Sequence, residues 1–151
     1  MFNVAYRIVK DEHYAEDVMQ EGFLKAFTKI DAYKNEVAFG AWLKKIIINT
    51  SIDLFKKNSK YKPEDYTDHT LKIEESDHNP TESLDFTNLK VQQILDTMNT
   101  LKDSYRVILT LFYIEGYDQE EISDILNISY SNCRTTLSRA KDCLRIKLMK
   151  L

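Results

Sequence analysis

The sequence predicts an all-α protein with two small helical modules joined by a flexible acidic linker. Apolar residues recur every three or four positions in both halves of the chain, which is the pattern of amphipathic helices. The 151 residues include only three glycines and two prolines, too few for the turns of a sheet-rich fold. Between the halves, residues 61–85 carry eight acidic side chains, two lysines and both prolines. This composition predicts a linker, because the alternative, a structureless loop of that length within one compact domain, is uncommon.

Before the linker, the apolar spacing predicts three helices. The first starts at Phe2, and the second extends from an N-cap at Asp11 to the region of Ile30. The third begins at Phe39 and continues into a basic run that ends at Lys60. We expect the apolar stripe of each helix to face the core of this domain. The stripes comprise Ala15, Val18, Met19, Gly22, Phe23, Ala26, Phe27 and Ile30 in the second helix, and Phe39, Trp42, Leu43, Ile46, Ile47, Thr50 and Leu54 in the third.

After the linker, the spacing predicts four more helices. The first lies around residues 91–98, and the second ends before Gly116, which is a natural stop. The third opens at Asp118, with Glu121 three residues on, the spacing of a capping box. The last helix extends from the region of Ser131 to the end of the chain. Its apolar face comprises Cys133, Leu137, Ala140, Leu144 and Leu148.

The last two helices have the pattern of a helix-turn-helix. A short helix is followed by a turn at residues 127–130 and then by a longer helix with polar residues at its start. From Arg134 to Leu151 there are six basic residues and one acidic residue, which favours contact with a nucleic acid. A solvent-exposed helical hairpin without such a role is the alternative. The polar residues opposite the apolar face suit base edges and phosphates; they are Ser131, Asn132, Arg134, Thr135, Ser138 and Arg139.

One stripe of the third helix combines an aromatic ring, an amide and two lysines. These residues are Trp42, Lys45, Asn49 and Lys56. An aromatic ring can stack on an unpaired base, an amide can read a base edge, and lysines can contact phosphates. The stripe therefore suits single-stranded or partly opened DNA. Taken alone, however, the helix favours a simpler interpretation in which Trp42 belongs to the core and the lysines form a solvated face.

The outer face of the second helix carries a leucine among polar residues. Such a face would suit a protein partner with basic and apolar groups, although a single exposed leucine is ordinary. The residues of this face are Asp17, Gln20, Glu21, Leu24 and Thr28.

The sequence contains no pattern typical of an enzyme, a metal site or a membrane span. The three glycines are far apart, which excludes a glycine-rich phosphate loop. Cys133 and Cys143 are too far apart on one helix for a disulfide and have no histidine at ligand spacing. No apolar run is long enough to cross a bilayer, and no signal pattern opens the chain. We therefore expect a cytoplasmic protein without metal or cofactor.

Together these features resemble a known family. Residues 17–27 and 39–53 resemble region 2 of bacterial sigma factors, and residues 116–129, followed by residues 136–140 and Leu144, resemble region 4. Two such regions joined by a short acidic linker are typical of extracytoplasmic-function (ECF) sigma factors of the sigma-70 family. The expected domains follow from this resemblance: they are region 2 at 1–60, the linker at 61–88 and region 4 at 89–151.

The resemblance implies a protein that binds core RNA polymerase through the β′ clamp helices and the β flap. It also implies that the protein directs the polymerase to promoter DNA and helps to open it. An anti-sigma factor is a further implied partner. The implied sites are Asp17, Gln20, Glu21 and Leu24 for core polymerase, the loop 31–39 with Trp42, Lys45, Asn49 and Lys56 for the minus-10 element, and Arg134, Thr135, Ser138 and Arg139 for the minus-35 element.

The chain also differs from the family pattern. Family members usually have a further helix before the position of Met1, so region 2 is expected to lack its first helix. Thr136 stands where a basic residue is common, which would remove a phosphate contact. A stand-alone helix-turn-helix transcriptional regulator, with a ligand-binding or dimerisation domain before the DNA-binding part, is the alternative function.

Overall fold

The computed structural model describes residues 1–58 and 88–150, and all regular structure within them is helical. The predicted all-α class is therefore confirmed. The chain divides into two compact units, Met1–Lys62 (unit 1) and Pro63–Leu151 (unit 2). The predicted acidic stretch at 61–85 lies outside the described residues, so the expected linker and its limits stay predictions.

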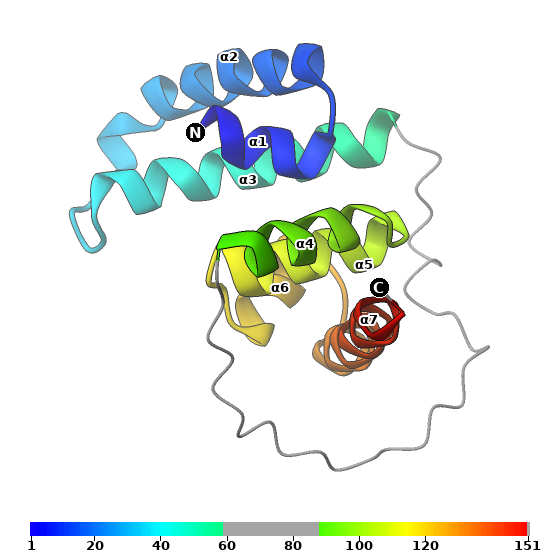
Figure 1. Cartoon of the computed structure of the whole chain (residues 1–151). Coiled ribbons are helices and arrows are strands. Elements are labelled where there is room, and N and C mark those ends of the chain that lie inside the picture. Colours follow the sequence, from blue (N-terminus) through cyan, green and yellow to red (C-terminus); the bar gives the residue numbers. More distant parts are fainter. Residues whose placement is uncertain (59–87, 151) are drawn as a thin grey trace. The chain divides into compact units, whose positions relative to one another are not determined.

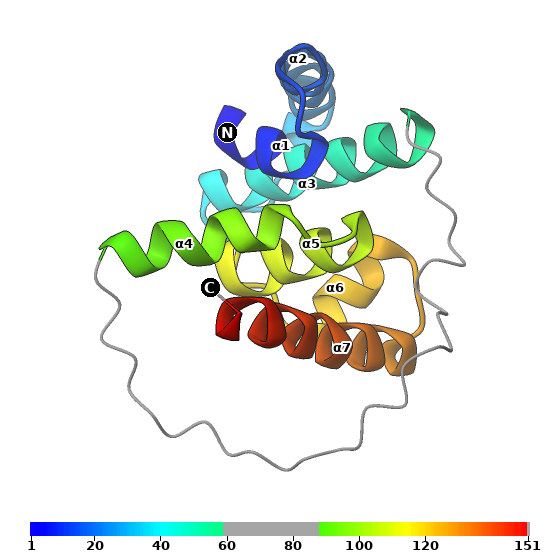
Figure 2. The ribbon, with the colours of Figure 1, turned by 45° about the vertical axis from the view of Figure 1, so that its right-hand side comes forward.

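Unit 1 is a three-helix arrangement in which each helix packs against the other two (Figures 1 and 2). Its elements are α1 (Phe2–Val9), α2 (Glu12–Thr28), the short 3₁₀ turn η1 (Ile30–Ala32) and α3 (Phe39–Asn58). The chain reverses between α1 and α2 because Lys10 adopts the left-handed conformation, with φ 57°. The predicted N-cap is confirmed: the Asp11 carboxylate accepts from the Tyr14 backbone N–H at 3.1 Å.

The core of unit 1 depends on small residues of α2 that face large ones of α3. Gly22 is buried, and a Cβ atom at this position would overlap the side chain of Ile47. The most buried part of α3 includes Ile48 and Ile52, which have 0% and 1% exposure. Neither was in the predicted stripe. Three consecutive isoleucines cover more than half of a helical turn, so their spacing alone does not show which of them faces the core.

Three large residues in the second half of the predicted α2 stripe are exposed, although Ala26 between them is buried. Phe23 is 38% exposed, Ile30 is 44% exposed and Phe27 is 73% exposed, so the prediction that this stripe is buried along its whole length is wrong. The first half, by contrast, includes Ala15 and Val18, which are fully buried. The C-terminal half of α2 thus presents aromatic side chains to solvent.

Unit 2 is built around its last helix. The elements are α4 (Asn88–Asn99), α5 (Asp103–Leu109), a π-helical turn η3 (Thr110–Ile114), α6 (Gln119–Leu126) and α7 (Tyr130–Met149). Helix α7 packs against α4, α5 and α6. Its predicted apolar face is confirmed for Cys133, Leu137, Ala140 and Leu144, which are all buried. Leu148, at the end of the predicted face, is half-buried.

The predicted end of the second helix at Gly116 is confirmed, although the helix ends in an unexpected way. Its last turn is a π-helix, in which the Glu115 N–H donates to the carbonyl oxygen of Thr110 at 3.0 Å. Gly116 then has φ 76°, a conformation that glycine adopts without a steric penalty. Nothing in the sequence pattern marked the π-helical turn.

Local capping fixes the two helices of the predicted helix-turn-helix. Asp118 and Glu121 form the predicted capping box, with hydrogen bonds of 2.8 and 3.1 Å. Asn127 ends α6 in the left-handed conformation, with φ 55°. Ser129 then caps α7 by accepting from the Asn132 backbone N–H at 3.1 Å. Helix α7 accordingly begins at Tyr130, one residue earlier than expected.

Candidate nucleic-acid and protein-binding surfaces

The exposed face of α7 carries the residues predicted to read duplex DNA. Arg134, Thr135 and Ser138 are exposed and Arg139 is half-buried. They lie away from the buried face of the same helix, which is anchored to α6: the Cys133 thiol donates to the Gln119 carbonyl oxygen at 3.3 Å. The structure therefore brings the four predicted residues together on one side of a capped and packed helix. This is the geometry that a major-groove recognition helix requires.

Aromatic rings lie beside two of the cations of α7. The guanidinium carbon of Arg134 lies 6.0 Å from the ring centroid of Tyr130, which is half-exposed at the start of the helix. The ammonium of Lys141 lies 4.5 Å from the Phe112 ring and 5.6 Å from the Tyr113 ring, both in the π-helical turn. Burial lowers the pKa of Lys141. These cation–π contacts restrict where the two positive charges can lie.

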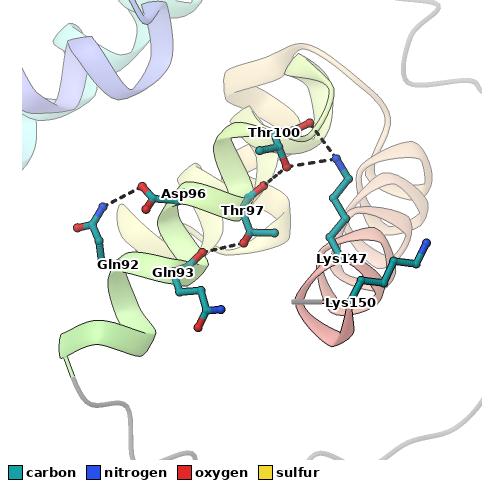
Figure 3. Close-up of a pocket in the computed structure, with 7 residues that line it drawn as sticks. All are labelled: Gln92, Gln93, Asp96, Thr97, Thr100, Lys147 and Lys150. Atoms are coloured by element: carbon teal, nitrogen blue, oxygen red, sulfur yellow. Dashed lines mark hydrogen bonds between the residues drawn. The ribbon is translucent and has the colours of Figure 1, made fainter.

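Two other polar positions of α7 make contacts within unit 2. Thr136 is 1% exposed, so its side chain is packed inside the unit and does not lie on the exposed side of the helix. The ammonium of Lys147 donates to the carbonyl oxygen of Thr100 at 3.0 Å and to its hydroxyl at 3.2 Å (Figure 3). Lys147 thus caps the C-terminal end of α4. It also borders a groove of about 570 Å³ that is lined by Gln92, Gln93, Asp96, Thr97, Thr100, Lys147 and Lys150.

The predicted stripe on α3 lies at the surface of unit 1. Lys45 and Asn49 are exposed, and Trp42 and Lys56 are half-buried. Burial lowers the pKa of Lys56, and the charge of Asp53 opposes this shift. The simpler interpretation, with Trp42 in the core, is not confirmed, because Trp42 is only half-buried. The buried face of α3 is formed by Leu43, Ile47, Ile48, Thr50, Ser51 and Ile52.

Trp42 belongs to a cluster of three aromatic rings. Its ring centroid lies 5.2 Å from that of Tyr33 and 5.6 Å from that of Phe39, and the Tyr33 and Phe39 centroids are 5.6 Å apart. The Tyr33 hydroxyl donates to the Val37 carbonyl oxygen at 2.6 Å. Sequence reasoning assigned the loop 31–39 as a whole but did not single out Tyr33. The sequence signal was the pair of aromatic residues, Tyr33 and Phe39, within this loop.

The outer face of α2 is exposed as predicted. Asp17, Gln20 and Glu21 are exposed, and Leu24 is 68% exposed. Leu24 is not isolated, because Phe27, one turn further along, is 73% exposed. Phe27 was assigned to the buried stripe, so the apolar part of this surface is larger than the sequence suggested. Acidic, amide and apolar side chains thus share one helix face.

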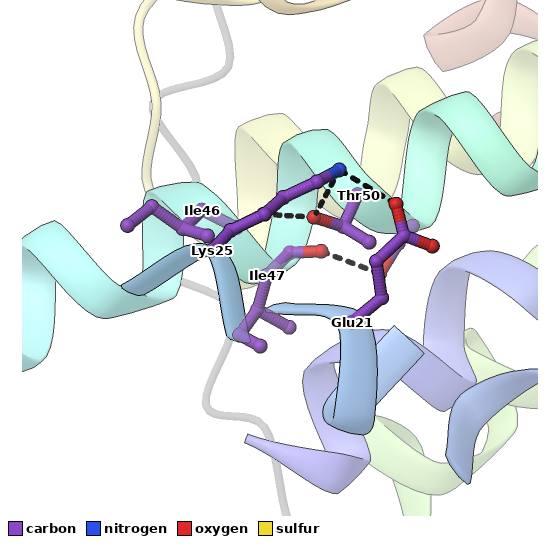
Figure 4. A network of polar contacts seen from close by, with 6 residues as sticks. Glu21, Lys25, Ile46, Ile47 and Thr50 are labelled. Atoms are coloured by element: carbon purple, nitrogen blue, oxygen red, sulfur yellow. Dashed lines mark hydrogen bonds and ion pairs between the residues drawn. The ribbon is translucent and has the colours of Figure 1, made fainter. Parts of the chain in front are cut away.

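Glu21 also takes part in contacts within the chain. Its carboxylate lies 2.8 Å from the Lys25 ammonium, which also donates to the Thr50 hydroxyl at 3.4 Å (Figure 4). The Thr50 hydroxyl in turn donates to the Ile46 carbonyl oxygen at 2.8 Å. Glu21 is therefore linked through Lys25 to α3. A substitution of Glu21 changes this link as well as any contact with a partner.

Within residues 1–58 and 88–150, no group of His, Cys, Asp and Glu side chains is arranged to hold a metal ion. Cys133 is buried and Cys143 is half-buried, and both are free thiols as predicted. Burial raises the pKa of Cys133, so this thiol stays protonated at neutral pH. None of the described helices is long and apolar enough to cross a membrane.

Two sigma-70 families match the two units. Sigma-70 region 2 matches residues 1–61, and Sigma-70, region 4 matches residues 91–144. Among curated proteins, the ECF RNA polymerase sigma factor SigM of Bacillus subtilis is 32% identical over 95% of this chain and 87% of its own length. SigW of the same organism is 30% identical over 100% of this chain and 84% of its own length.

Solved structures share the fold. The sigma factor RpoE, in a co-crystal with the anti-sigma factor NepR from Bartonella quintana, matches with a TM-score of 0.59 and 24% identity, over 99% of this chain and 89% of that one. CnrH, in complex with the cytosolic domain of CnrY, matches with a TM-score of 0.56 and 21% identity, over 99% and 80% of the two chains. The matches to both sigma regions leave the alternative of a stand-alone regulator without support. The chain belongs to the ECF RNA polymerase sigma factors of the sigma-70 family.

Proposed function

We propose that this sigma factor uses three separate surfaces to start transcription: one for core polymerase, one for opened DNA and one for duplex DNA. The observation that carries the proposal is the recognition face of α7. Its polar residues are exposed on one side, while Cys133, Leu137 and Ala140 fix the orientation of the helix from the other.

We assign core polymerase binding to the outer face of α2, formed by Asp17, Gln20, Glu21 and Leu24. Carboxylates beside exposed apolar groups suit a partner surface that is both basic and apolar. The exposure of Phe27 extends the apolar part of this surface. The β′ clamp helices are the proposed partner of this face, and the β flap is the proposed partner of unit 2.

We assign the minus-10 element to the stripe of α3 formed by Trp42, Lys45, Asn49 and Lys56. The aromatic cluster supports this assignment, because it presents half-buried and exposed rings at the start of the helix that carries the two lysines and the amide. Stacking of a base on an aromatic ring contributes about 1–3 kcal/mol and does not depend strongly on the base. Such a surface can hold a strand once its bases have separated from their partners.

We assign the minus-35 element to Arg134, Thr135, Ser138 and Arg139. An arginine can donate two hydrogen bonds to O6 and N7 of guanine, whereas hydroxyl groups accept or donate at several bases and phosphates. We also propose an anti-sigma factor as a regulator, because RpoE was solved with the anti-sigma factor NepR.

The assignment of α2 is tested by binding to purified core polymerase. Leu24→Ala and Phe27→Ala should each weaken core binding by about 1 kcal/mol or more, because exposed apolar groups that become buried at an interface lose most of their contacts on truncation. Val37→Ala is the matched control, since Val37 is an exposed apolar residue (54%) of the same unit and lies in the loop before α3, outside the face assigned to core polymerase. Normal core affinity in both α2 variants would remove this helix from the proposed interface.

A further inference from the structure

We propose that the hydroxyl of Tyr33 positions the site for opened DNA: its hydrogen bond to Val37 holds the loop before α3 closed and keeps the Trp42 ring in place to stack on an unpaired base. The inference rests on the proposed role of α3 in promoter opening. It assigns Tyr33 a positioning role and leaves the contact with the base to Trp42.

The hydrogen bond closes the loop across its base. The Tyr33 hydroxyl donates to the Val37 carbonyl oxygen at 2.6 Å. Between these residues, Asn35 has φ 57°, the left-handed conformation that lets the chain reverse. The Tyr33 N–H donates to the Ile30 carbonyl oxygen at 3.2 Å, so the donor itself is fixed to the turn η1. The hydroxyl therefore joins a fixed residue to the far side of the loop.

The Tyr33 ring transmits this restraint to Trp42. The two ring centroids are 5.2 Å apart, with an angle of 41° between the ring planes. Phe39 completes the cluster, with its ring nearly perpendicular to that of Tyr33 and tilted by 39° from that of Trp42. Because each ring contacts the other two, a shift of the Tyr33 ring changes the orientations that are open to Trp42.

The cluster contributes little to the core of unit 1. Phe39 is 47% exposed and Tyr33 and Trp42 are half-buried, whereas Ile47 and Ile48 of the core are fully buried. A hydrogen bond at the surface competes with water and adds little to global stability. Its main consequence is to reduce the freedom of a loop before a ligand binds, which lowers the entropic cost of binding.

The test uses Tyr33→Phe, which removes the hydroxyl and retains the ring. Tyr6→Phe is the matched control, because Tyr6 lies on α1, where its ring stacks on Phe2.

The fluorescent label is 7-azatryptophan, incorporated in place of Trp42, which is the only tryptophan of the chain. After assembly with unlabelled core polymerase, its emission reports on the aromatic cluster alone. The probe is the single-stranded non-template strand of a promoter that the wild-type holoenzyme selects from a random library. Four quantities are compared: emission quenching by this strand, promoter opening by permanganate reactivity, affinity for the closed promoter, and the unfolding temperature of the chain.

We expect Tyr33→Phe to reduce both strand affinity and promoter opening by about three- to tenfold, the effect of one ordinary hydrogen bond. Closed-promoter affinity and the unfolding temperature should match those of wild type, and Tyr6→Phe should match wild type in all four measurements. Normal opening and strand binding by Tyr33→Phe would overturn the inference, as would a parallel loss of stability and closed-promoter binding. If the wild-type holoenzyme itself shows neither quenching nor opening, the proposed role of α3 fails, and the inference fails with it.

Discussion

Arg134 extends from the exposed side of α7, close to the ring of Tyr130. If its guanidinium donates to a guanine, Arg134→Ala should relax the preference at one base pair by about 1–3 kcal/mol, in addition to weakening binding. The measurement is transcription by the holoenzyme from every single-base variant of the minus-35 element. A loss by the same factor on all variants would instead identify Arg134 as a phosphate contact.

Lys147→Ala is the control for this experiment. Both substitutions remove one positive charge from α7, but the Lys147 ammonium is bonded to the carbonyl oxygen of Thr100. We therefore expect Lys147→Ala to lower the unfolding temperature slightly and to leave the base preference unchanged. The sequence alone suggested at most a weak phosphate contact at this position, because the contact with Thr100 joins residues that are 47 positions apart.

Glu21 has two roles to separate, a proposed contact with polymerase and an ion pair with Lys25. Glu21→Lys should reduce core affinity by about tenfold or more, because like charges would then face each other across the interface. The double variant Glu21→Lys with Lys25→Glu re-forms an ion pair within the helix, which is worth about 0.3–0.5 kcal/mol. It should recover stability but not core affinity. Recovery of core affinity in the double variant would show that Glu21 acts only through Lys25.

At the scale of single helices, the close approach of α2 and α3 depends on Gly22. A Cβ at this position would overlap the end of the Ile47 side chain, and Ile47 is fully buried, so it would have to change its conformation within the core. Gly22→Ala should therefore destabilise unit 1 by about 1–3 kcal/mol, the usual effect of overpacking.

Gly40 offers the matched comparison. It also lies in a helix, α3, but a Cβ there would meet no atom within 4 Å. Gly40→Ala should stabilise the chain by about 0.4–1 kcal/mol, because alanine loses less backbone entropy on folding. Thermal unfolding of the two variants measures whether each substitution raises or lowers the stability of the chain. A stabilising Gly22→Ala would show that the Ile47 side chain can move aside at little cost.

The elements that were predicted correctly are those whose signals are local in sequence. The N-cap at Asp11, the capping box at Asp118 and the stop at Gly116 each depend on residues within one turn. The apolar face of α7 was also predicted, because its residues are well spaced and packed by helices on several sides. The exposure of Phe27 was not, because periodicity shows that residues share a face but not how far the neighbouring helices extend along it.

The candidate site was predicted unevenly for a similar reason. The polar residues of α7 and α2 could be assigned to exposed faces from helical geometry alone. The aromatic cluster could not be predicted in this way. The ring of Tyr33 contacts Trp42 of α3 across a loop, and a contact between rings nine residues apart depends on the tertiary structure. The π-helical turn at residues 110–114, which brings two rings to Lys141, likewise has no sequence signature that we recognise.

At the scale of the whole chain, charge is distributed unevenly. The acidic residues between positions 61 and 85 contrast with the basic end of the chain after Arg134. We propose that charge repulsion disfavours contact between this acidic stretch and DNA. Because the whole chain has a net charge of -3, we expect it to bind DNA poorly unless core polymerase is present.

The measurement that tests the account most directly is transcription by core polymerase from a library of random promoters, with and without this chain. We predict transcripts that require the chain and start at a fixed distance downstream of two enriched elements. The upstream element should lose its preference at one position with Arg134→Ala, and Tyr33→Phe should reduce output without changing either element. Transcripts that do not depend on the chain, or the absence of any enriched element, would contradict the account.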